Sequence, residues 1–241
     1  MKNLIYQTFI TDKEEPEFVS LSRNAFKKYA DECGADYLFS NKKWFDKYPT
    51  KSSEFFEKLR IFFDESFDRY DQVLYVDCDV LPYDKSSYIF DLNHSGIAMM
   101  PEKNTPSRNF VPPFVDFKST HAKAIYNLCK AYGQNCGYFD DGQIRWYNNG
   151  VILTSREMRQ HARKNFDPIS TFKQPENKHM FIYCDEPYIK LMLEKNNIVV
   201  TELDECWNLT GAIKDSNVPD NAKFLHFSGK LKRAMRMYYE N

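Results

Sequence analysis

Apolar residues at the start of the chain follow strand spacing and helix spacing in turn. Residues 3–10 are rich in β-branched and aromatic residues, which predicts a strand. In residues 16–33 the apolar positions recur at steps of three and four, which predicts a helix, and Gly34 is a natural stop. Residues 35–39 predict a second strand. The chain therefore begins with a strand, a helix and a strand.

The next segments continue this alternation and predict the centre of a sheet. Residues 52–67 predict a second helix whose phenylalanines, Phe55 among them, form a wide buried face. Residues 72–76, with the sequence QVLYV, form an apolar run bounded by charged residues. Such a run is typical of a strand covered by helices on both faces of a parallel sheet. We therefore expect this strand to be central.

The second half of the chain keeps the same pattern, without an internal repeat or a linker. Residues 101–113 contain four prolines and predict a loop, and the polar residues 134–149 are at least partly irregular. Strands are expected at 96–100, 150–155, 197–203 and 222–229, and helices at 156–165 and 185–196. We expect a single α/β domain over residues 1–241, with a mixed, mostly parallel sheet flanked by helices.

Charge and cysteine content narrow the choice of partners and compartment. Lys and Arg number 33 and Asp and Glu 34, so the net charge of −1 gives no reason to expect nucleic acid. The six cysteines include no C-x-x-C pair, which argues against a zinc ribbon and a disulfide framework. The opening residues do not read as a secretory signal, and no apolar run is long enough to span a bilayer. We expect a cytoplasmic protein without a transmembrane segment.

A basic run near the C-terminus, residues 230–241 with Lys230, Lys232, Arg233 and Arg236, leaves two interpretations open. Its lysines and arginines could make peripheral contact with an anionic membrane surface. Alternatively, one face of the run binds phosphate and the other is solvated.

The candidate chemistry follows the central strand. Asp77 and Asp79 come directly after residues 72–76, and in an extended segment residues two apart share a face, so both carboxylates point one way while Cys78 points into the core. Open α/β sheets bind ligands at the carboxyl ends of their strands. Adjacent carboxylates need a compensating cation, and Mg²⁺ or Mn²⁺ takes such oxygen ligands together with substrate phosphates. The pair therefore predicts a metal-bridged phosphate ligand.

Two other interpretations of the acidic pair stay open. Asp77 and Asp79 could begin a solvated loop or cap the next turn. An apolar strand followed by D-x-D also opens phosphatases of the haloacid-dehalogenase type, in which the first Asp is the nucleophile. Those enzymes need a later acidic pair after a second strand, and Asp140 and Asp141 do not follow a convincing one.

The order of motifs resembles the family-8 type of glycosyltransferases, which includes glycogenin and bacterial galactosyl- and glucosyltransferases. The motifs are VLYVDCD, NNGVIL, DEPYI, CWN and HFSGKLK, and they run over nearly the whole chain. The resemblance implies the GT-A nucleotide-sugar fold, a Mn²⁺ (or Mg²⁺) ion, a UDP-sugar donor and transfer with retention. It also implies a nucleotide-binding half at about residues 1–100 and a sugar and acceptor half at about 101–241.

The family's metal and diphosphate motifs match residues from both halves. The resemblance implies that Asp77 and Asp79 bind the metal, with Asp77 also near the ribose. His226 matches the histidine of H-x-x-G-x-x-K and is the implied third metal ligand, and a satisfied histidine at a strand end is the alternative. Gly229 and Lys232 match the residues that hold the diphosphate, where glycine lets the backbone approach and lysine neutralises phosphate.

Further matches imply contacts with the donor sugar. Asn149 and Gly150 match the family's entry to a strand, where the asparagine contacts the sugar, and Asn148-Asn149-Gly150 could equally form only a tight turn. Asp185 matches a residue that faces the transferred sugar, and it also suits a helix N-cap. Lys58 matches a basic residue that approaches the donor, and a solvated helix face is the alternative.

The resemblance is less complete elsewhere. The opening strand occupies the nucleotide-base edge in this fold, so Gln7 and Thr8 are candidates for uracil contacts. Trp207 and Asn208 resemble the family's W-N element, and Trp207 is as readily an ordinary core residue. The chain departs from the family pattern at Pro187, Lys190, Arg233 and Ala234. These positions concern the acceptor and the sugar pocket.

We therefore predict a metal-dependent hexosyltransferase that moves a sugar from a UDP-sugar to a glycan, protein or lipid acceptor. The first alternative is a non-catalytic domain that binds nucleotide sugars or glycans within a larger polypeptide. The second is the phosphatase described above.

Overall fold

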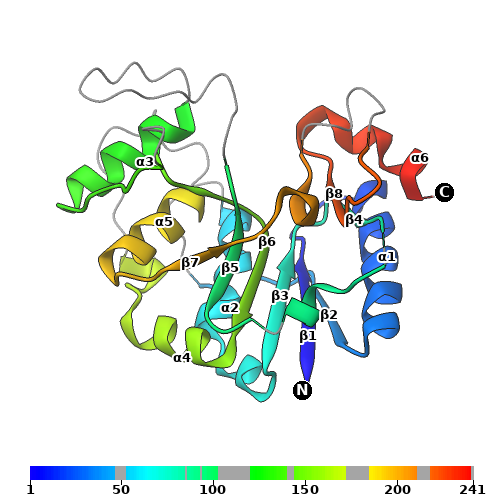
Figure 1. The fold of residues 1–241 in the computed structure, drawn as a ribbon, viewed down its shortest axis with the longest axis horizontal. Helices are drawn as coiled ribbons and strands as arrows, with labels where there is room; N and C mark the ends of the chain where they lie inside the picture. Colours follow the sequence, from blue (N-terminus) through cyan, green and yellow to red (C-terminus); the bar gives the residue numbers. More distant parts are fainter. Residues whose placement is uncertain are drawn as a thin grey trace.

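Figure 1 shows the computed structural model of the chain. The residues that it describes are 1–46, 53–84, 86–92, 94–102, 120–139, 144–171, 185–210 and 218–239. Most of the predicted loop at 101–113 lies outside these residues, and so do Asp140 and Asp141.

Six strands form the central sheet. They are β1 (Asn3–Thr8), β2 (Asp36–Ser40), β3 (Gln72–Val76), β5 (Ile97–Pro101), β6 (Tyr147–Ser155) and β7 (Val200–Glu202). Their order in space is β2-β1-β3-β6-β5-β7. β1 is parallel to β2 and β3, and β5 to β7, whereas β6 is antiparallel to both of its neighbours. The prediction of a mixed, mostly parallel sheet with residues 72–76 inside it is confirmed.

Helices cover both faces of this sheet (Figure 1). The described helices are α1 (Glu17–Cys33), α2 (Arg60–Phe63), α3 (Thr120–Ala131), α4 (Arg156–Asn165), α5 (Asp185–Lys195) and α6 (Met235–Tyr239), of which α3 packs on α5 and α6 on α1. Successive side chains of a strand point to opposite faces. Leu74 and Val76 accordingly pack with α1, while Val73 and Tyr75 pack with α2, α4 and α5. Every residue of β3 is buried, which accounts for its continuous apolar sequence.

A small second sheet joins the C-terminal part of the chain to the end of β3. It consists of β4 (Val80–Pro82) and β8 (Phe224–His226), which are antiparallel. Next to it, Leu81, Leu225 and Met235 belong to a separate core cluster against which Phe18 of α1 packs. The final segment, the 3₁₀-helix η8 (Gly229–Ala234) followed by α6, thereby lies beside α1 (Figure 1).

The segment predicted as one helix at 52–67 is instead a series of short helices. Its described part consists of the 3₁₀-helix η1 (Ser53–Leu59), α2 and the 3₁₀-helix η2 (Glu65–Arg69). Asp64 ends α2 in an extended conformation, and its carboxylate accepts a hydrogen bond from the Ser66 N–H at 2.8 Å, which caps η2. In a 3₁₀-helix residues three apart share a face, so Phe56 and Leu59 lie on one side of η1 and Phe55 lies off it. Phe56 is buried, but Phe55 is 44% exposed, so its predicted burial is wrong.

Two element boundaries affect the functional interpretation. Gly34 ends α1 with a φ of 68°, as its predicted role as a stop requires. β6 begins at Tyr147, earlier than the predicted residue 150, so Asn149 and Gly150 lie inside a strand. The remaining described 3₁₀-helices are η3 (Ile89–Leu92), η4 (Ile169–Thr171) and η6 (Glu205–Asn208).

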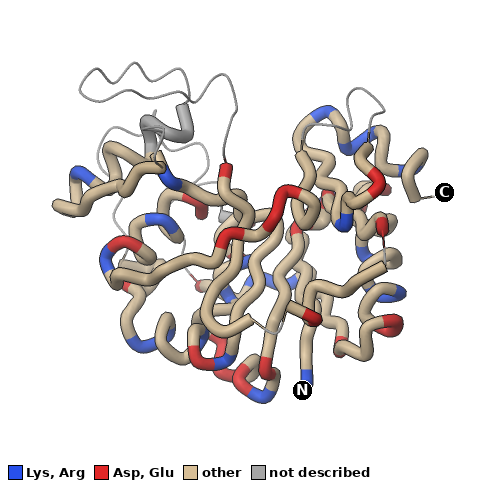
Figure 2. The backbone as a smooth tube through the Cα atoms, viewed as in Figure 1, with Lys and Arg blue, Asp and Glu red and all other residues tan. Residues whose placement is uncertain are grey.

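Charged residues of both signs are interspersed over the helices on either side of the sheet (Figure 2). This distribution agrees with the net charge of −1. Within the described ranges, no helix has both the length and the apolar character needed to cross a bilayer.

Candidate active site

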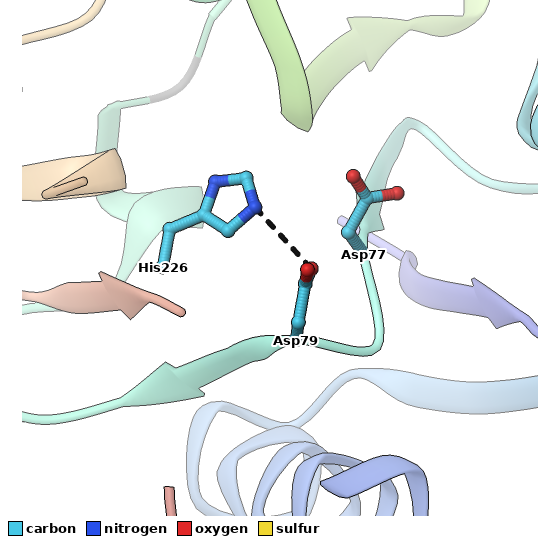
Figure 3. Close-up of side chains that lie close together, drawn as sticks. All are labelled: Asp77, Asp79 and His226. Atoms are coloured by element: carbon cyan, nitrogen blue, oxygen red, sulfur yellow. Dashed lines mark ion pairs between the residues drawn. The ribbon is translucent and has the colours of Figure 1, made fainter. Parts of the chain in front are cut away.

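The turn between β3 and β4 presents the two predicted carboxylates. The Asp77 N–H donates to the Gly150 carbonyl at 2.8 Å, which holds this residue against β6. Asp79 directly precedes β4. Between them, Cys78 is 5% exposed, and its thiol donates to the Thr8 carbonyl at 3.5 Å. Cys78 is therefore in the core, as predicted, and the two carboxylates face a common space (Figure 3).

The pairing of β4 with β8 brings His226 to these acids. Val80 is paired with His226, and the Phe227 N–H donates to the Asp79 carbonyl at 2.7 Å. The His226 Nε2 lies 3.2 Å from Asp79 Oδ1. One potential ligand atom from each of Asp77, Asp79 and His226 lies within 4.8 Å of the others (Figure 3). Residues far apart in sequence thus form a donor set suited to a divalent cation.

Two lysines compensate the carboxylates. Lys232 Nζ lies 3.0 Å from Asp79 Oδ2. Lys58 Nζ lies 3.0 Å from Asp77 Oδ1 and 3.1 Å from Asp185 Oδ2. Lys58 is 5% exposed, so the alternative of a solvated helix face is wrong. Its single ammonium group links the acid at the end of β3 to the acid at the start of α5.

Burial and charge act in opposite directions on the pKa values of the site. Burial raises the pKa of Asp79, but His226 and Lys232 outweigh it, and the pKa lies below its usual range. Burial lowers the pKa of His226, and the charge of Asp79 outweighs it, so that pKa is raised. Burial also lowers the pKa of Lys58, and two carboxylates more than reverse the effect. The attraction between these groups therefore holds Asp79 anionic and Lys58 cationic.

Position 150 requires a glycine because there is no space for a side chain, not because of its backbone conformation. Its φ is not positive, so the interpretation of Asn149-Gly150 as only a tight turn is wrong. A Cβ atom at position 150 would lie 2.5 Å from His226 Cε1 and 2.8 Å from His226 Nδ1. The imidazole thus packs directly on the backbone of β6. The neighbouring Asn149 is buried, and its Nδ2 donates to Asp185 Oδ2 at 3.5 Å.

Two further predicted residues lie at the starts of helices. Asp185 is the first residue of α5 and is 3% exposed. Gly229 begins η8 with a φ of 63°, a conformation that glycine adopts without strain. It is exposed, and a Cβ there would meet no atom within 4 Å. In the same 3₁₀-helix, Lys232 Nζ lies 4.8 Å from the ring centroid of Phe18.

A cleft of about 390 Å³ opens beside the acids. Its polar lining residues are Thr8, Glu54, Lys58, Asp77, Asp79 and Lys232. Its other walls come from Phe9, Ile10, Pro16, Phe18, Phe55, Tyr75 and Cys78. Apolar walls with a few convergent charged groups are typical of small-molecule sites. The exposed ring of Phe55 is part of this lining.

The sequence model for glycosyl transferase family 8 matches residues 8–233. The chain belongs to this family. The match includes Asp77, Asp79, His226 and Lys232, and it removes the phosphatase interpretation of the acidic pair. A comparison with curated proteins found no match.

Solved glycosyltransferase structures share the fold of this family 8 protein. One is a glycosyltransferase involved in the glycosylation of the major capsid of PBCV-1. It is 13% identical to this chain, its TM-score is 0.57, and the alignment covers 99% of this chain and 98% of that one. The galactosyltransferase LgtC, solved with donor and acceptor sugar analogs, is 12% identical and has a TM-score of 0.56, and the alignment covers 98% of this chain and 95% of LgtC. Mouse xyloside xylosyltransferase 1 is 11% identical and has a TM-score of 0.51, and the alignment covers 95% of this chain and 98% of the mouse protein. These neighbours support the predicted GT-A fold.

Gln7 and Thr8 differ in their access to the cleft of the family 8 protein. Gln7 is fully buried, and its Nε2 donates to Ser22 Oγ at 2.9 Å and to the Asp77 carbonyl at 3.3 Å. Its Oε1 accepts from the Tyr37 hydroxyl at 2.8 Å. With both ends of its amide engaged, Gln7 supports the turn at Asp77 and offers no surface for the predicted uracil contact. Thr8 lines the cleft, and the prediction stays open for that residue.

Three site residues were not predicted from the sequence. The Tyr75 hydroxyl donates to Asp77 Oδ1 at 2.5 Å, and its position two residues earlier on the same strand could have indicated this contact. Asn148 and Asn208 are buried behind His226. The resemblance singled out the W-N element, but nothing in the sequence indicated which side chain its asparagine contacts.

Proposed function

We propose that this family 8 protein transfers a hexose-type sugar from a UDP-sugar to a glycan, protein or lipid acceptor, in a reaction that depends on a divalent metal. The observation that carries the proposal is the convergence of Asp77, Asp79 and His226 beside the cleft. UDP as the nucleotide and retention of configuration rest on the family resemblance.

The residues present fit a divalent cation. Two carboxylates and one imidazole suit Mn²⁺, and Mg²⁺ is the other candidate. Asp77, Asp79 and His226 would hold the ion. When bound, it would neutralise the negative charge that develops on the diphosphate leaving group.

Groups of this chain would hold the diphosphate and favour its departure. Lys232 is positioned at the cleft by its contacts with Asp79 and Phe18, and its ammonium can donate to phosphate oxygens. Gly229 allows the backbone to approach the phosphates without a Cβ in the way. Donors placed where charge develops contribute most to such a reaction.

Our assignment of Asn149 and Asp185 to the transferred sugar rests on the family resemblance alone, since they are 2% and 3% exposed and are not among the described residues that line the cleft. They contact one another at 3.5 Å, and Lys58 links Asp185 to Asp77 of the metal set. We propose that Lys58 holds the sugar-binding acid at a set distance from the metal-binding acid. Lys58 itself has little surface for a ligand, since it is 5% exposed.

We also propose that the protein is cytoplasmic. Among the described residues, Cys33, Cys78, Cys129, Cys136 and Cys206 are free thiols. Free thiols persist in a reducing environment, which supports the cytoplasm.

A thermal-shift panel of nucleotide sugars with and without Mn²⁺ tests the proposal. A ligand that binds only the folded protein raises the melting temperature. At a free ligand concentration of 100 times the Kd, the free energy of unfolding rises by about 2.7 kcal/mol. We expect a shift with one UDP-sugar that needs Mn²⁺ and disappears in Asp79→Asn. Asp71→Asn, at the opposite end of β3, is the matched control and keeps the shift.

Turnover separates an enzyme from a binding domain. We expect slow Mn²⁺-dependent hydrolysis of the same UDP-sugar, with release of UDP. Binding without any release of UDP would favour the non-catalytic alternative, and failure of every nucleotide sugar to bind would refute the proposed function.

A further inference from the structure

Behind His226, a series of buried side chains leads away from its second ring nitrogen. Asn208 Oδ1 lies 3.0 Å from His226 Nδ1, and Asn208 Nδ2 donates to Asn148 Oδ1 at 2.8 Å. Asn148 Nδ2 in turn donates to Glu102 Oε1 at 2.8 Å. Asn208 is fully buried and Asn148 is 9% exposed. We call Asn148 and Asn208 the amide pair.

Neighbouring groups determine the orientation of the Asn148 amide. The Gly150 backbone N–H donates to Asn148 Oδ1 at 2.8 Å, and a backbone N–H can only donate. On the other side, the Glu102 carboxylate can only accept when it is ionised, so it faces Asn148 Nδ2. Both contacts require the same orientation. A reversed amide would set two donors against each other at Gly150 and two acceptors against each other at Glu102.

This orientation determines the proton on His226. Because Asn148 Oδ1 only accepts, the neighbouring group of Asn208 must be its NH₂. The Asn208 oxygen then faces His226 Nδ1, and that nitrogen must carry a hydrogen to make the contact. A neutral imidazole has one N–H. Asp79 Oδ1 lies 3.2 Å from Nε2 and attracts a proton there, so Nε2 offers a lone pair only in the neutral ring, in which the one hydrogen stays on Nδ1.

We propose that Asn208 and Asn148 are positioning residues that hold neutral His226 as its Nδ1–H tautomer, so that Nε2 is available to a divalent metal. The inference rests on the proposed metal site and assigns a role to the asparagine of the W-N element. Ligand histidines in metal sites commonly donate their other N–H to a neighbouring acceptor, which fixes the tautomer and the ring orientation. Gly150 completes the support, because the ring packs directly on its backbone.

The tautomer can be measured in the wild-type protein without any ligand. Long-range ¹H–¹⁵N correlation spectra distinguish the two neutral tautomers of histidine, and a His226→Gln spectrum identifies the signals of this residue among the five histidines. At a pH where the ring is neutral, we expect the Nδ1–H form. A predominant Nε2–H form would overturn the proposal, whether or not the protein binds metal.

Two variants test the amide pair. Asn208→Leu removes the acceptor, and we expect a mixture of tautomers and a roughly 10- to 100-fold weaker affinity for Mn²⁺. Asn208→Asp keeps an acceptor for Nδ1–H, so it should retain the tautomer and bind Mn²⁺ more tightly than Asn208→Leu. The matched control is Thr154→Val, which removes a buried hydroxyl from the same strand that carries Asn148 and should leave the tautomer and the affinity unchanged.

The outcomes separate this inference from the proposed function. Wild-type protein that binds no Mn²⁺ would refute the metal site, while the ligand-free spectrum still decides the tautomer. An Asn208→Leu protein that keeps both the wild-type tautomer and the wild-type affinity would show that the amide pair does not position His226.

Discussion

The side chains of the site depend on one another for their charge state and for their space. Lys58 shares its ammonium group between Asp77 and Asp185, and Lys232 serves Asp79. His226 lies against the Gly150 backbone, where a side chain would collide with it. At this scale, a change in one residue leaves an unpaired charge or a clash in another, and two predictions follow from it.

Gly150→Ala should displace His226. The added Cβ would lie 2.5 Å from His226 Cε1, so the ring or the strand must move. We expect a loss of about 1–3 kcal/mol in the free energy of unfolding and an Mn²⁺ affinity at least about 10-fold weaker, measured by denaturation and titration calorimetry. Gly34→Ala, with a φ of 68° and no atom within 4 Å of its Cβ, is the control. It should cost about 1 kcal/mol through backbone strain and leave the affinity unchanged.

Lys58→Met should destabilise the protein by about 3 kcal/mol, because it leaves Asp77 and Asp185 without their shared cation in a largely buried position. Urea denaturation measures the change. The double variant Lys58→Met/Asp185→Asn removes one of the stranded charges and should recover part of the loss. Equal free energies of unfolding for wild type and Lys58→Met would mean that solvent stabilises the charges of Asp77 and Asp185 as well as Lys58 does.

At the scale of elements, the packing of α4 shows how backbone groups at the opposite end of the sheet are satisfied. Arg159 of α4 is fully buried, and its guanidinium donates to the carbonyls of Thr154, Phe67 and Tyr70, which ties the helix to β6 and η2. Burial lowers the pKa of Arg159 to about 10, still well above neutrality. This one side chain therefore links carbonyl groups of β6, of η2 and of the residue that follows η2.

Arg159→Met should cost about 3 kcal/mol or more, because it removes the hydrogen bonds of a buried guanidinium to the carbonyls of Thr154, Phe67 and Tyr70. Its control is Arg156→Met on the same helix, whose pair with Asp71 at 2.7 Å is more than a third exposed and is expected to contribute under about 1 kcal/mol. Denaturation midpoints at an unchanged m-value give both numbers. A similar cost for the two variants would contradict the assigned role.

At the scale of the whole molecule, the site is completed by the last part of the chain. β8 and η8 supply His226 and Lys232. They are held by the small β4–β8 sheet and by the core cluster around Leu225 and Met235, while Phe224 of β8 packs into a core cluster of the main sheet. The donors to the proposed metal thus come from the end of β3 and from this last part of the chain. A ligand that binds both should stabilise one against the other.

Hydrogen exchange should reveal this coupling. Without ligands, we expect amides of β8 and of the residue after it, such as those of His226 and Phe227, to open at lower free energy than amides of β3, because the core cluster around Leu225 and Met235 is the smaller one. UDP with Mn²⁺ should slow exchange in β4 and β8 together. Equal protection of β3 and β8 without ligand would show that the molecule opens as one unit.

The sequence alone determined most elements, because apolar spacing and helix stops act locally. The runs at 72–76 and 156–165 match β3 and α4, and the D-x-D pair after the central strand led directly to the acids of the site. The division of 52–67 was not predictable, because the capping of η2 by Asp64 competes with a continuous helix and packing decides between them.

Only the tertiary structure decided which distant residues meet. Lys58 looked like a residue of a solvated helix face and Gly150 like part of a turn, and both interpretations failed because their surroundings come from other parts of the chain. The contact between Asn208 and His226 likewise depends on the pairing of β4 with β8. Local patterns record the preferences of neighbouring residues, whereas the charge compensation and close packing of a buried site arise from contacts that form only when the chain is folded.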